Sequence, residues 1–389
     1  MSGFRAALAT PGLAAIAEVK RRSPSAGDLR PDADPARLAA QFARAGAAAV
    51  SILVDERFGG TWDDLRAARS SSGVPLLAKG FFSTEEHLAT ARDAGADAVL
   101  LLLRDLDDAA VSDLLGVAAR LGLETLVEAH DAHELERAVA LGAPVIGINA
   151  RDLSTFRIDR RRQLELVTQC HKAAPGRVVI AESGIESRAQ GAAAELAGAD
   201  AILVGSTLMR APDPAAKLQE LLSRPLVKVC GLTRDEDVAA AVEAGADMVG
   251  FVLVDASPRR AASVLPAPDT LLTVAVVVGT AETDGADLVQ LYPPESGKVR
   301  GRDAVLLRDG VEVARVVDLP WDEEDASHFE RARSVEGRLM PAGGLGPENV
   351  GAAIAEVRPW AVDASSSLER APGVKDHQRM RDYVEAARA

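Results

Sequence analysis

Charged and polar residues stand at the ends of short apolar runs in the first half of the chain. Lys79 ends the run LLAK and Glu128 ends TLVE, while Glu18 and Lys20 end AAIAEVK. Carboxylates and ammonium groups that gather in one mouth tune each other's pKa values, which suits them to general acid and base catalysis. The residues at such ends are Glu18, Lys20, Lys79, Glu128, Asn149, Arg151, Glu182, Ser183, Gly205 and Ser206.

A repeated phrase indicates which elements position these residues. A helical stretch ends in Gly-Ala and a short apolar run follows, as in ARDAGADAVLLLL from Ala91 to Leu103. Glycine supplies the left-handed cap that ends a helix, and the run has the length of a strand buried on both faces. Stretches such as Thr84 to Gly95 and Asp131 to Gly142 begin with a capping residue and an acidic first turn. Strands that alternate with helices require a parallel sheet, either doubly wound or closed into a barrel.

The closed barrel is the favoured form of this α/β sheet. No G-x-G-x-x-G follows the first strand, so a dinucleotide fold loses its main support. Polar residues after many successive strands instead converge on one mouth, as in a (β/α)₈ TIM barrel. The chain of 389 residues is long enough for two barrels, and the segment SRPLVKV from Ser223 to Val229 is the expected boundary. We therefore predict two tandem TIM barrels, residues 1–223 and 224–389, the second of them shortened.

Composition excludes several classes of function. The 44 basic and 58 acidic residues give a formal net charge of −14, which repels phosphate backbones, so nucleic acid is not an expected partner. Cys170 and Cys230 lack the spacing of a disulfide framework or of metal ligands, and we expect neither a metal nor a cofactor. Pro11 and Gly12 interrupt the apolar start, and no apolar run approaches about 18 residues. We expect no signal peptide, no membrane partner and a cytoplasmic location.

Seven ordered segments of the first half carry the pattern of a known family. They are IAEVKRRSPSAGDL (Ile16 to Leu29), FGG (Phe58 to Gly60), LLAKGFF (Leu76 to Phe82), TLVEAH (Thr125 to His130), GINARDL (Gly147 to Leu153), IAESGI (Ile180 to Ile185) and ILVGSTLM (Ile202 to Met209). Together they resemble indole-3-glycerol phosphate synthase. That family is a (β/α)₈ barrel that closes and decarboxylates carboxyphenylamino-deoxyribulose phosphate, releasing carbon dioxide and water, to form the indole of tryptophan.

The resemblance implies how this half performs its chemistry. Lys79 is the general acid that protonates a carbonyl as carbon attacks it, and Glu128 is the other proton-transfer residue, with Glu18 and Lys20 in the same mouth. A positioned acid or base typically contributes about 10²- to 10⁴-fold in rate.

The resemblance also implies which residues hold the substrate. Arg151, beside Asn149, binds the substrate carboxylate, and backbone N–H groups at helix starts bind the phosphate. Two features depart from the family, which usually has a longer N-terminal helical extension and an Asp where Gly80 stands. The implied substrate-binding residues are Ser25, Asn149, Arg151, Glu182 and Ser183, and the implied phosphate-binding residues are Gly184, Gly205 and Ser206.

The second half carries the pattern of another family. Its segments are KVCGLTRDEDV (Lys228 to Val238), GFVLVDASPRR (Gly250 to Arg260), VQLY (Val289 to Tyr292), PAGGLGPENV (Pro341 to Val350) and VDASSSLERAPGVKD (Val362 to Asp376). They resemble phosphoribosylanthranilate isomerase, which catalyses the preceding step, an Amadori rearrangement of an aminoaldose to an aminoketose. Fusion of the two enzymes in one chain is known. The resemblance implies that Cys230 is the base, that Arg259 holds the anthranilate carboxylate and that Gly343, Gly344, Ser365 and Ser366 cradle the phosphate.

The middle of this half departs from the family pattern, so we expect its barrel to be irregular there. QLYPPESG replaces the expected QLHG, and no Gly-rich loop or FDW helix start follows. Asp318, at the end of ARVVDL, is our candidate for the acid that opens the furanose ring. The RDG turn from Arg308 to Gly310 leaves little room for a helix before that strand, and Ser367 stands where the family has Gly.

Three readings of the function follow. The leading one is a bifunctional enzyme of tryptophan biosynthesis that acts on small phosphorylated anthranilate sugars at two separate sites and needs no cofactor or metal. The second is an active synthase fused to a catalytically impaired or non-catalytic isomerase-like barrel that supports or regulates it. The third is a pair of unrelated phosphate-binding barrels with other chemistry. The sequence leaves the oligomeric state open.

Overall fold

The computed structural model describes residues 3–23, 27–152, 155, 157–294, 303–318 and 327–389. The chain divides into two compact units. The first unit consists of Met1–Glu186 and Gly191–Leu222, and the second consists of Ser187–Gln190 and Ser223–Ala389.

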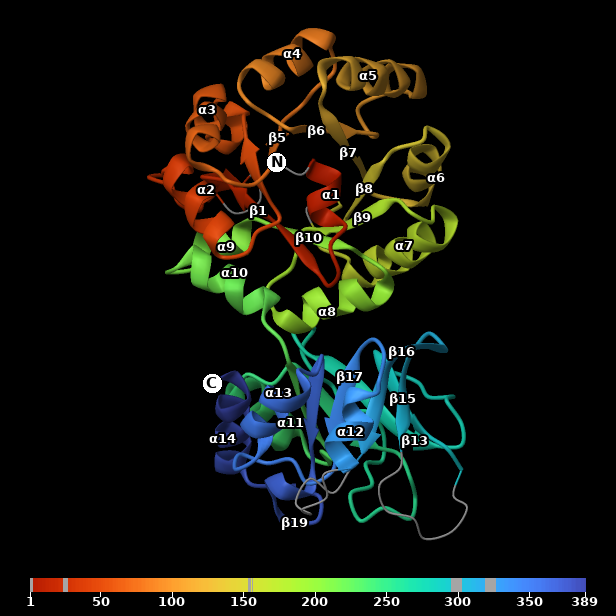
Figure 1. Ribbon diagram of the computed structural model, residues 1–389. Coiled ribbons are helices and arrows are strands. Elements are labelled where there is room, and N and C mark those ends of the chain that lie inside the picture. Colours follow the sequence, from red (N-terminus) through yellow and green to blue (C-terminus); the bar gives the residue numbers. More distant parts are fainter. Residues whose placement is uncertain (1–2, 24–26, 153–154, 156, 295–302, 319–326) are drawn as a thin grey trace. The chain divides into compact units, whose positions relative to one another are not determined.

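The first unit is a closed barrel of eight parallel strands, each followed by a helix, as predicted. In Figure 1 the helices form a ring around the strands. The strands are β1 (Ala14–Val19), β4 (Ala49–Leu53), β5 (Leu76–Lys79), β6 (Ala98–Leu102), β7 (Glu124–Ala129), β8 (Val145–Asn149), β9 (Val178–Glu182) and β10 (Ala201–Val204). The helices that follow them are α2 (Pro35–Arg44), α3 (Trp62–Ser71), α4 (Glu85–Asp93), α5 (Asp108–Leu121), α6 (Ala132–Ala140), α7 (Arg160–Ala173), α8 (Arg188–Ala197) and α10 (Pro214–Leu222).

Local sequence explains why these elements begin and end where they do. The side chain of Asp131 accepts a hydrogen bond from the backbone N–H of Glu134 at the start of α6, and Thr84 caps α4 in the same way. After α4 the chain turns through Gly95, whose φ of 96° favours glycine. Strand β6 follows at once and is buried along its whole length, because the barrel covers one face and the helices cover the other.

The short helix α1 (Phe4–Leu8) precedes the first strand and lies across the middle of the ring in Figure 1. Its Phe4 and Leu8 are fully buried. The backbone N–H of Arg5 donates to a carboxylate oxygen of Glu124 at 3.0 Å, at the residue that begins β7. Helix α1 therefore closes the amino-terminal end of the barrel and leaves the carboxyl ends of the strands open.

The second unit contains one sheet of eight strands in the order β17-β16-β15-β14-β13-β12-β11-β18, and a backbone hydrogen bond from Trp360 to Leu339 joins its two ends. It is a nearly closed barrel, which confirms the predicted second TIM barrel with its irregular middle. The strands are β11 (Leu226–Cys230), β12 (Met248–Val252), β13 (Leu272–Val278), β14 (Leu288–Tyr292), β15 (Ala304–Arg308), β16 (Val311–Asp318), β17 (Leu339–Ala342) and β18 (Ala361–Ala364).

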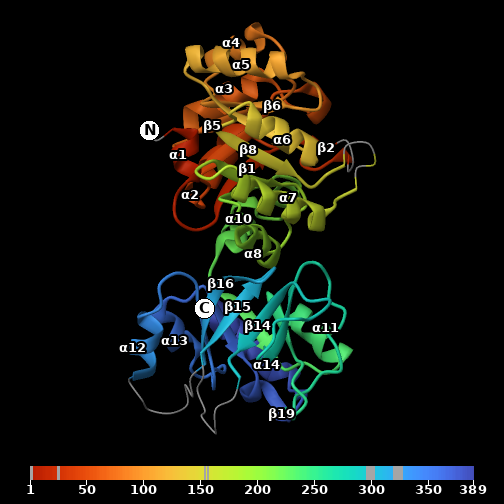
Figure 2. The same ribbon diagram turned by 90° about the vertical axis from the view of Figure 1, so that its right-hand side faces the viewer.

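The irregularity is a β-hairpin in place of a strand and helix unit. Strand β15 runs antiparallel to both β14 and β16, and Asp309 and Gly310, both with positive φ, form its turn. Figure 2 shows these three strands side by side. A turn of two residues can join only antiparallel strands, which is why no helix fits between them.

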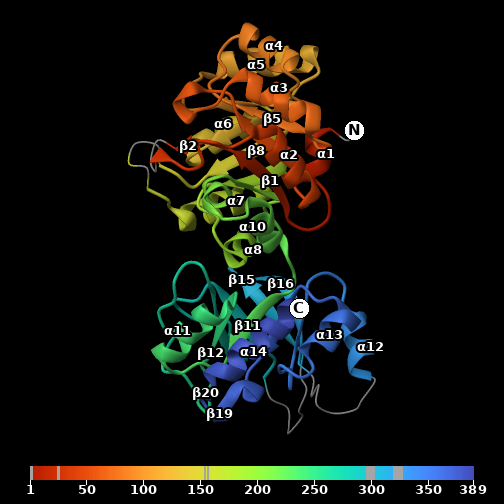
Figure 3. The ribbon, with the colours of Figure 1, turned by 90° about the vertical axis from the view of Figure 1, so that its left-hand side faces the viewer.

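The α-helices described in this unit after β11, β16, β17 and β18 pack in the order α11, α14, α13, α12 (Figure 3). They are α11 (Asp235–Ala244), α12 (Ser327–Arg333), α13 (Val350–Val357) and α14 (His377–Arg388). Within the described part of the chain, no helix of either unit is both long and apolar enough to cross a bilayer.

Candidate active site

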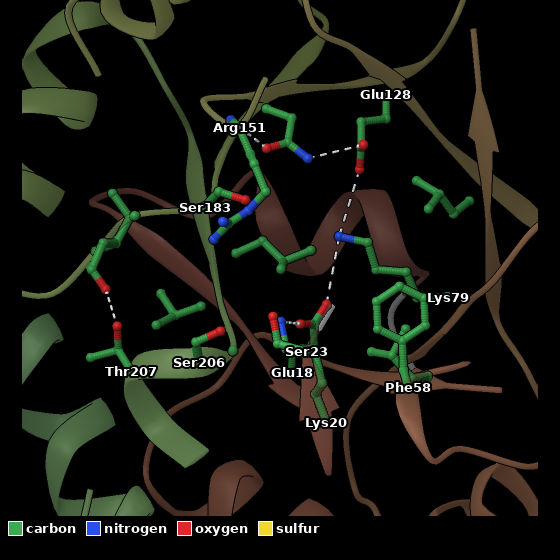
Figure 4. A pocket seen from close by; sticks show the side chains of 18 of the residues that line it. Glu18, Lys20, Ser23, Phe58, Lys79, Glu128, Arg151, Ser183, Ser206 and Thr207 are labelled. Atoms are coloured by element: carbon green, nitrogen blue, oxygen red, sulfur yellow. Dashed lines mark hydrogen bonds and ion pairs between the residues drawn. The ribbon is translucent and has the colours of Figure 1, made fainter. Parts of the chain in front are cut away.

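A cavity of about 440 Å³ opens at the carboxyl ends of the strands in the first unit. Figure 4 shows acidic and basic side chains from several strands pointing into it. The predicted residues that line it are Glu18, Lys20, Lys79, Glu128, Asn149, Arg151, Ser183, Gly184, Gly205 and Ser206. The predicted Glu182 lies directly beneath, fully buried, and the predicted Ser25 lies outside the described residues.

Lys79 is surrounded by three carboxylates. Its Nζ lies 2.7 Å from Oε2 of Glu182, 3.5 Å from Oε2 of Glu18 and 3.6 Å from Oε2 of Glu128. The carboxylates come from β9, β1 and β7, and none of their side chains is more than 4% exposed. The other oxygen of Glu18 contacts the ammonium group of Lys20 at 2.8 Å. The strand ends thus bring together residues that are far apart in the sequence.

These contacts set the charge of each group. Burial disfavours the ammonium form of Lys79, but the carboxylates of Glu182, Glu18 and Glu128 outweigh burial and raise its pKa. Burial opposes ionisation of Glu128 too, yet Lys79 and His130 outweigh it and lower the pKa of that carboxyl. Glu182 differs, because burial and the charge of Glu128 raise its pKa to about 8. The pKa of Glu18 is lowered too, by Lys20 and Lys79 against the effect of burial, so two carboxyl groups beside Lys79 favour the ionised form and the third, Glu182, favours the protonated form.

Two glycines provide the space for these carboxylates. A Cβ atom on Gly147 in β8 would lie 2.0 Å from Oε1 of Glu182, and one on Gly205 after β10 would lie 2.3 Å from Oε1 of Glu18. Neither glycine has a positive φ, so backbone conformation does not require them. Their role is to leave volume for the acids that contact Lys79.

We expect Gly147→Ala to reduce catalytic turnover in the first unit by about tenfold or more, because the added methyl group displaces Glu182 from Lys79. Overpacking of this kind also typically costs about 1–3 kcal/mol of stability. Steady-state kinetics and thermal melting check this expectation. Gly116→Ala in α5 is the matched control, because its Cβ would meet nothing closer than 3.8 Å. Equal activity of the two variants would contradict the role given to Gly147.

Arg151, Ser183 and Ser206 lie across the cavity from Lys79 (Figure 4). Ser183 and Gly184 follow β9 with φ of 71° and 70°, and Gly205 and Ser206 lie at the start of the short helix α9 (Ser206–Arg210). The guanidinium of Arg151 faces the same space, where burial and the nearby charge of Arg210 lower its pKa. This combination of cationic side chains and turning backbone suits the carboxylate and phosphate of an anionic substrate.

Several residues of the cavity escaped the sequence analysis. Ser23 lines it, whereas the prediction named Ser25 of the same SPS phrase. Phe81 lies at the mouth, stacked on Phe58 at 6.5 Å between ring centroids, and the guanidinium of Arg57 lies 3.8 Å from the Phe81 centroid. Arg210 also lines the cavity and was not predicted. The phrases FGG and LLAKGFF pointed to the two aromatic segments, but nothing in the sequence showed that they meet.

A second polar cluster occupies the interior of the barrel in the second unit. Cys230 ends β11 and is 6% exposed, and the fully buried Lys228 on the same strand donates to Asp363 of β18 at 2.7 Å. Burial raises the pKa of the Cys230 thiol and Asp363 adds to that effect, while Lys228 opposes it. A Cβ atom on Gly250 of β12 would lie 2.7 Å from the Cys230 sulfur, so this glycine also provides space.

The predicted Asp318 belongs to the same cluster. Its Oδ2 accepts a hydrogen bond of 2.7 Å from the hydroxyl of Tyr292, which accepts one of 2.9 Å from the amide of Gln290. The Gln290 carbonyl accepts from Lys228 at 2.9 Å. A chain of hydrogen bonds thus links Asp318 to the strand that carries Cys230. Burial raises the pKa of Asp318, and the hydrogen bond from Tyr292 partly offsets that effect.

The predicted substrate-binding residues of the second unit lie at the same strand ends. The guanidinium of Arg259 donates to both oxygens of Glu369 at 2.9 Å. A Cβ atom on Gly231 would meet both Arg259 and Ser365, so these residues adjoin the turn after Cys230. The other predicted phosphate-binding residues are Gly343 and Gly344, which follow β17 with positive φ, and Ser366, which begins the 3₁₀ turn η2 (Ser366–Leu368) after β18.

The fold and the two clusters define the class of protein. Each unit is a TIM barrel with buried titratable side chains where its strands end, and cationic side chains and turning backbone also line the cavity of the first. In the part of the chain that the structure describes, no three His, Cys, Asp or Glu residues are placed to hold a metal ion.

Comparison with known proteins identifies the family. The sequence model of the indole-3-glycerol phosphate synthase family matches residues 2–221. The sequence model of the N-(5'-phosphoribosyl)anthranilate isomerase family matches residues 325–386. Tryptophan biosynthesis protein TrpCF of Yersinia pestis is 35% identical over 96% of this chain and 84% of its own length. Indole-3-glycerol phosphate synthase 2 of Streptomyces coelicolor is 45% identical over 56% of this chain and 84% of its own, and the synthase of Mycobacterium ulcerans is 43% identical over 56% and 79%.

The chain belongs to the indole-3-glycerol phosphate synthase family, in the form fused to phosphoribosylanthranilate isomerase. It is a bifunctional enzyme of tryptophan biosynthesis, with a carboxy-lyase in its first half and an isomerase in its second. Its substrates are small phosphorylated molecules.

Proposed function

We propose that residues 1–223 close the indole ring in the cavity around Lys79 and that residues 224–389 perform the Amadori rearrangement beside Cys230. The substrates are the corresponding anthranilate sugar phosphates, and the bacterial biosynthetic relatives support a cytoplasmic location. The observation that carries the synthase assignment is the position of Lys79, with its Nζ within 3.6 Å of three buried carboxylates.

The first step of the synthase reaction is carbon–carbon bond formation. The aromatic carbon that bears the carboxylate attacks the sugar carbonyl, and Lys79 donates a proton to the carbonyl oxygen. Its surrounding carboxylates keep Lys79 protonated, which is the form that this step needs. Carbon dioxide then leaves, and its bonding electrons remain in the ring system.

The second step is loss of the new hydroxyl group as water, which needs an acid and a base. Glu128 is ionised and its Oε2 makes no hydrogen bond among the described residues, so we assign it the base role and Lys79 the acid role. Glu182, at 2.7 Å from Lys79 with a pKa raised to about 8, is placed to return a proton to Lys79 between steps. The surroundings of Glu128 lower its pKa and those of Glu182 raise its pKa. Such a difference lets one carboxyl group accept a proton while the other donates one.

The substrate lies across the cavity in this proposal. Its phosphate binds at Gly184, Gly205 and Ser206, its carboxylate binds Arg151, and Phe58 and Phe81 provide an apolar wall for its aromatic ring. Lys20, paired with Glu18, adds a second cation near the reacting carbonyl.

The isomerase reaction needs a proton on the furanose oxygen and removal of one from C2. We assign the first role to Asp318, because burial raises its pKa and favours the protonated form, and the second to Cys230. Arg259 binds the anthranilate carboxylate, and Gly343, Gly344, Ser365 and Ser366 bind the phosphate.

A coupled assay that starts from phosphoribosylanthranilate tests both halves of the proposal. The purified protein should form indole-3-glycerol phosphate from it, and also from carboxyphenylamino-deoxyribulose phosphate supplied directly. Failure with the second substrate would overturn the synthase assignment and would favour barrels with other chemistry.

The alternative of an impaired isomerase half rests on two observations, the reversed strand β15 and Tyr292 where the family has His. Complementation distinguishes it from the leading proposal. A gene that rescues a strain lacking the synthase but not one lacking the isomerase would establish the alternative.

Removing the Tyr292 hydroxyl tests whether this residue supports Asp318. We expect Tyr292→Phe to lower isomerase kcat/KM by up to about tenfold, the effect of one hydrogen bond. Without that hydrogen bond the pKa of Asp318 rises further, so its acid form persists to higher pH and the pH optimum of the isomerase moves up. The synthase activity of the same sample is the internal control. An unchanged isomerase profile would show that Tyr292 does not act on the acid.

A further inference from the structure

His130 stands two residues after Glu128, where the chain leaves β7 and enters α6, and its imidazole lies between two carboxylates. Its Nε2 is 3.1 Å from Oε1 of Glu128, and its Nδ1 is 3.0 Å from Oε2 of Glu134. The backbone N–H of His130 donates to the same Glu134 oxygen at 2.8 Å. The side chains of His130 and Glu134 are each 13% exposed.

This geometry favours a charged imidazole, because each ring nitrogen lies beside a carboxylate oxygen, although Nε2 makes no well-directed hydrogen bond among the described residues. A neutral imidazole carries one N–H and can face only one carboxylate as a donor, whereas an imidazolium donates from both nitrogens. Burial opposes the charge, but Glu128 and Glu134 raise the pKa of His130 to about 10. Glu134 is itself fixed, because its backbone N–H donates to the capping carboxylate of Asp131 at 2.9 Å.

The contacts of Glu128 divide between its two oxygens. Oε1 faces His130 and accepts a hydrogen bond of 3.0 Å from the amide of Asn149. Oε2 is buried and has no hydrogen-bond partner among the described residues, with Lys79 3.6 Å away. Glu18 of β1 and Glu182 of β9 add negative charge on the same side. One oxygen is therefore held in place while the other remains available to a bound substrate.

We propose that His130 is a positioning residue of the synthase reaction: held by Glu134, its imidazolium orients Glu128 and keeps it ionised, so that Oε2 accepts the proton of the dehydration step. This inference rests on the proposed role of Glu128 as the base. His130 touches no reacting atom and acts through that carboxylate.

The pH dependence of the synthase tests the proposal with His130→Asn and Glu134→Gln. Without the imidazolium, the pKa of Glu128 rises. As the pH is lowered, Glu128 therefore becomes protonated, and loses its base form, at a higher pH than in the wild type. We expect the acid limb of the His130→Asn profile to move up by about one pH unit or more, which is about a tenfold loss of kcat/KM on that limb. The loss should become small at alkaline pH, and KM should change little. Glu134→Gln should move the limb in the same direction by a smaller amount.

His133→Asn in α6 is the matched control, because His133 is exposed and lies beside the same carboxylates in sequence. It should reproduce the wild-type profile. A loss in His130→Asn that is equal at every pH, or an acid limb that does not move, would overturn the proposal and leave His130 a structural residue.

A titration that does not depend on turnover keeps the inference separate from the proposed function. In nitrogen NMR spectra of the full chain, the imidazole missing from His130→Asn spectra identifies His130. It should remain doubly protonated at about pH 8, well above the usual histidine pKa of about 6.5. A neutral ring at neutral pH would contradict the bridge, whereas failure of the wild type to convert its substrate would count only against the proposed function.

Discussion

Lys79→Ala is expected to lower synthase kcat by about 10²- to 10⁴-fold, the range for a positioned acid. The variant loses the group that protonates the carbonyl, and Glu18, Glu128 and Glu182 lose the ammonium that lies within 3.6 Å of all three. Single-turnover kinetics with carboxyphenylamino-deoxyribulose phosphate measure the effect. The isomerase activity of the same sample should not change.

The stability of the Lys79→Ala variant should depend on pH. Lys79 lowers the pKa of both Glu18 and Glu128, so it stabilises the folded protein at pH values where these carboxylates are ionised. The decrease in melting temperature should therefore be larger at about pH 7 than at about pH 3, below the usual glutamate pKa of about 4.3. Lys79→Met, which keeps most of the aliphatic stem, separates loss of charge from loss of packing. Lys172→Ala on the exposed side of α7 is the control. Near-normal turnover of folded Lys79→Met would refute the acid role.

Cys230→Ser is expected to lower isomerase kcat/KM by at least about 10²-fold and to leave the synthase unchanged. A hydroxyl has nearly the volume of a thiol but ionises far less readily, so the variant removes the proposed thiolate base with little change in packing. Burial raises the pKa of Cys230, so the wild-type isomerase should gain activity as the pH rises and the thiolate forms, until Asp318 loses its proton.

The matched control for this variant is Cys170→Ser, which alters the other buried cysteine, on α7 in the first unit. It should leave the isomerase profile unchanged. If Cys230→Ser kept the wild-type rate and pH profile, another group would have to be the base, and Asp363 at the end of β18 would be the next residue to replace.

The sequence was sufficient to predict the first barrel because each of its signals is local. The glycine after α4 has the positive φ that ends a helix, and the buried run of β6 follows directly. The second barrel was harder to predict, because β15 has the apolar pattern of any strand and its direction depends on the turn at Asp309 and Gly310. The sequence RDG left little room for a helix between β15 and β16. It did not show that the sheet would still contain eight strands.

Only those residues of the candidate site that lie at the ends of strands could be predicted from the sequence. Lys79, Glu128 and Glu182 follow their strands, and a closed barrel brings such residues together. The proposed role of His130 was not predictable, because its contact with Glu134 depends on how α6 begins. The pairing of Tyr292 with Asp318 was missed for a similar reason, since it joins strands on either side of β15.

The space left by three glycines matters for the design of a new catalytic centre of this kind. They are Gly147, Gly205 and Gly250. Copying the charged residues and the thiol onto another barrel would fail wherever the host has a methyl group at these three positions, because the space is already occupied. A design must therefore specify empty volume as strictly as it specifies reactive groups, and a mutational library should find these three glycines as intolerant of change as the residues beside them.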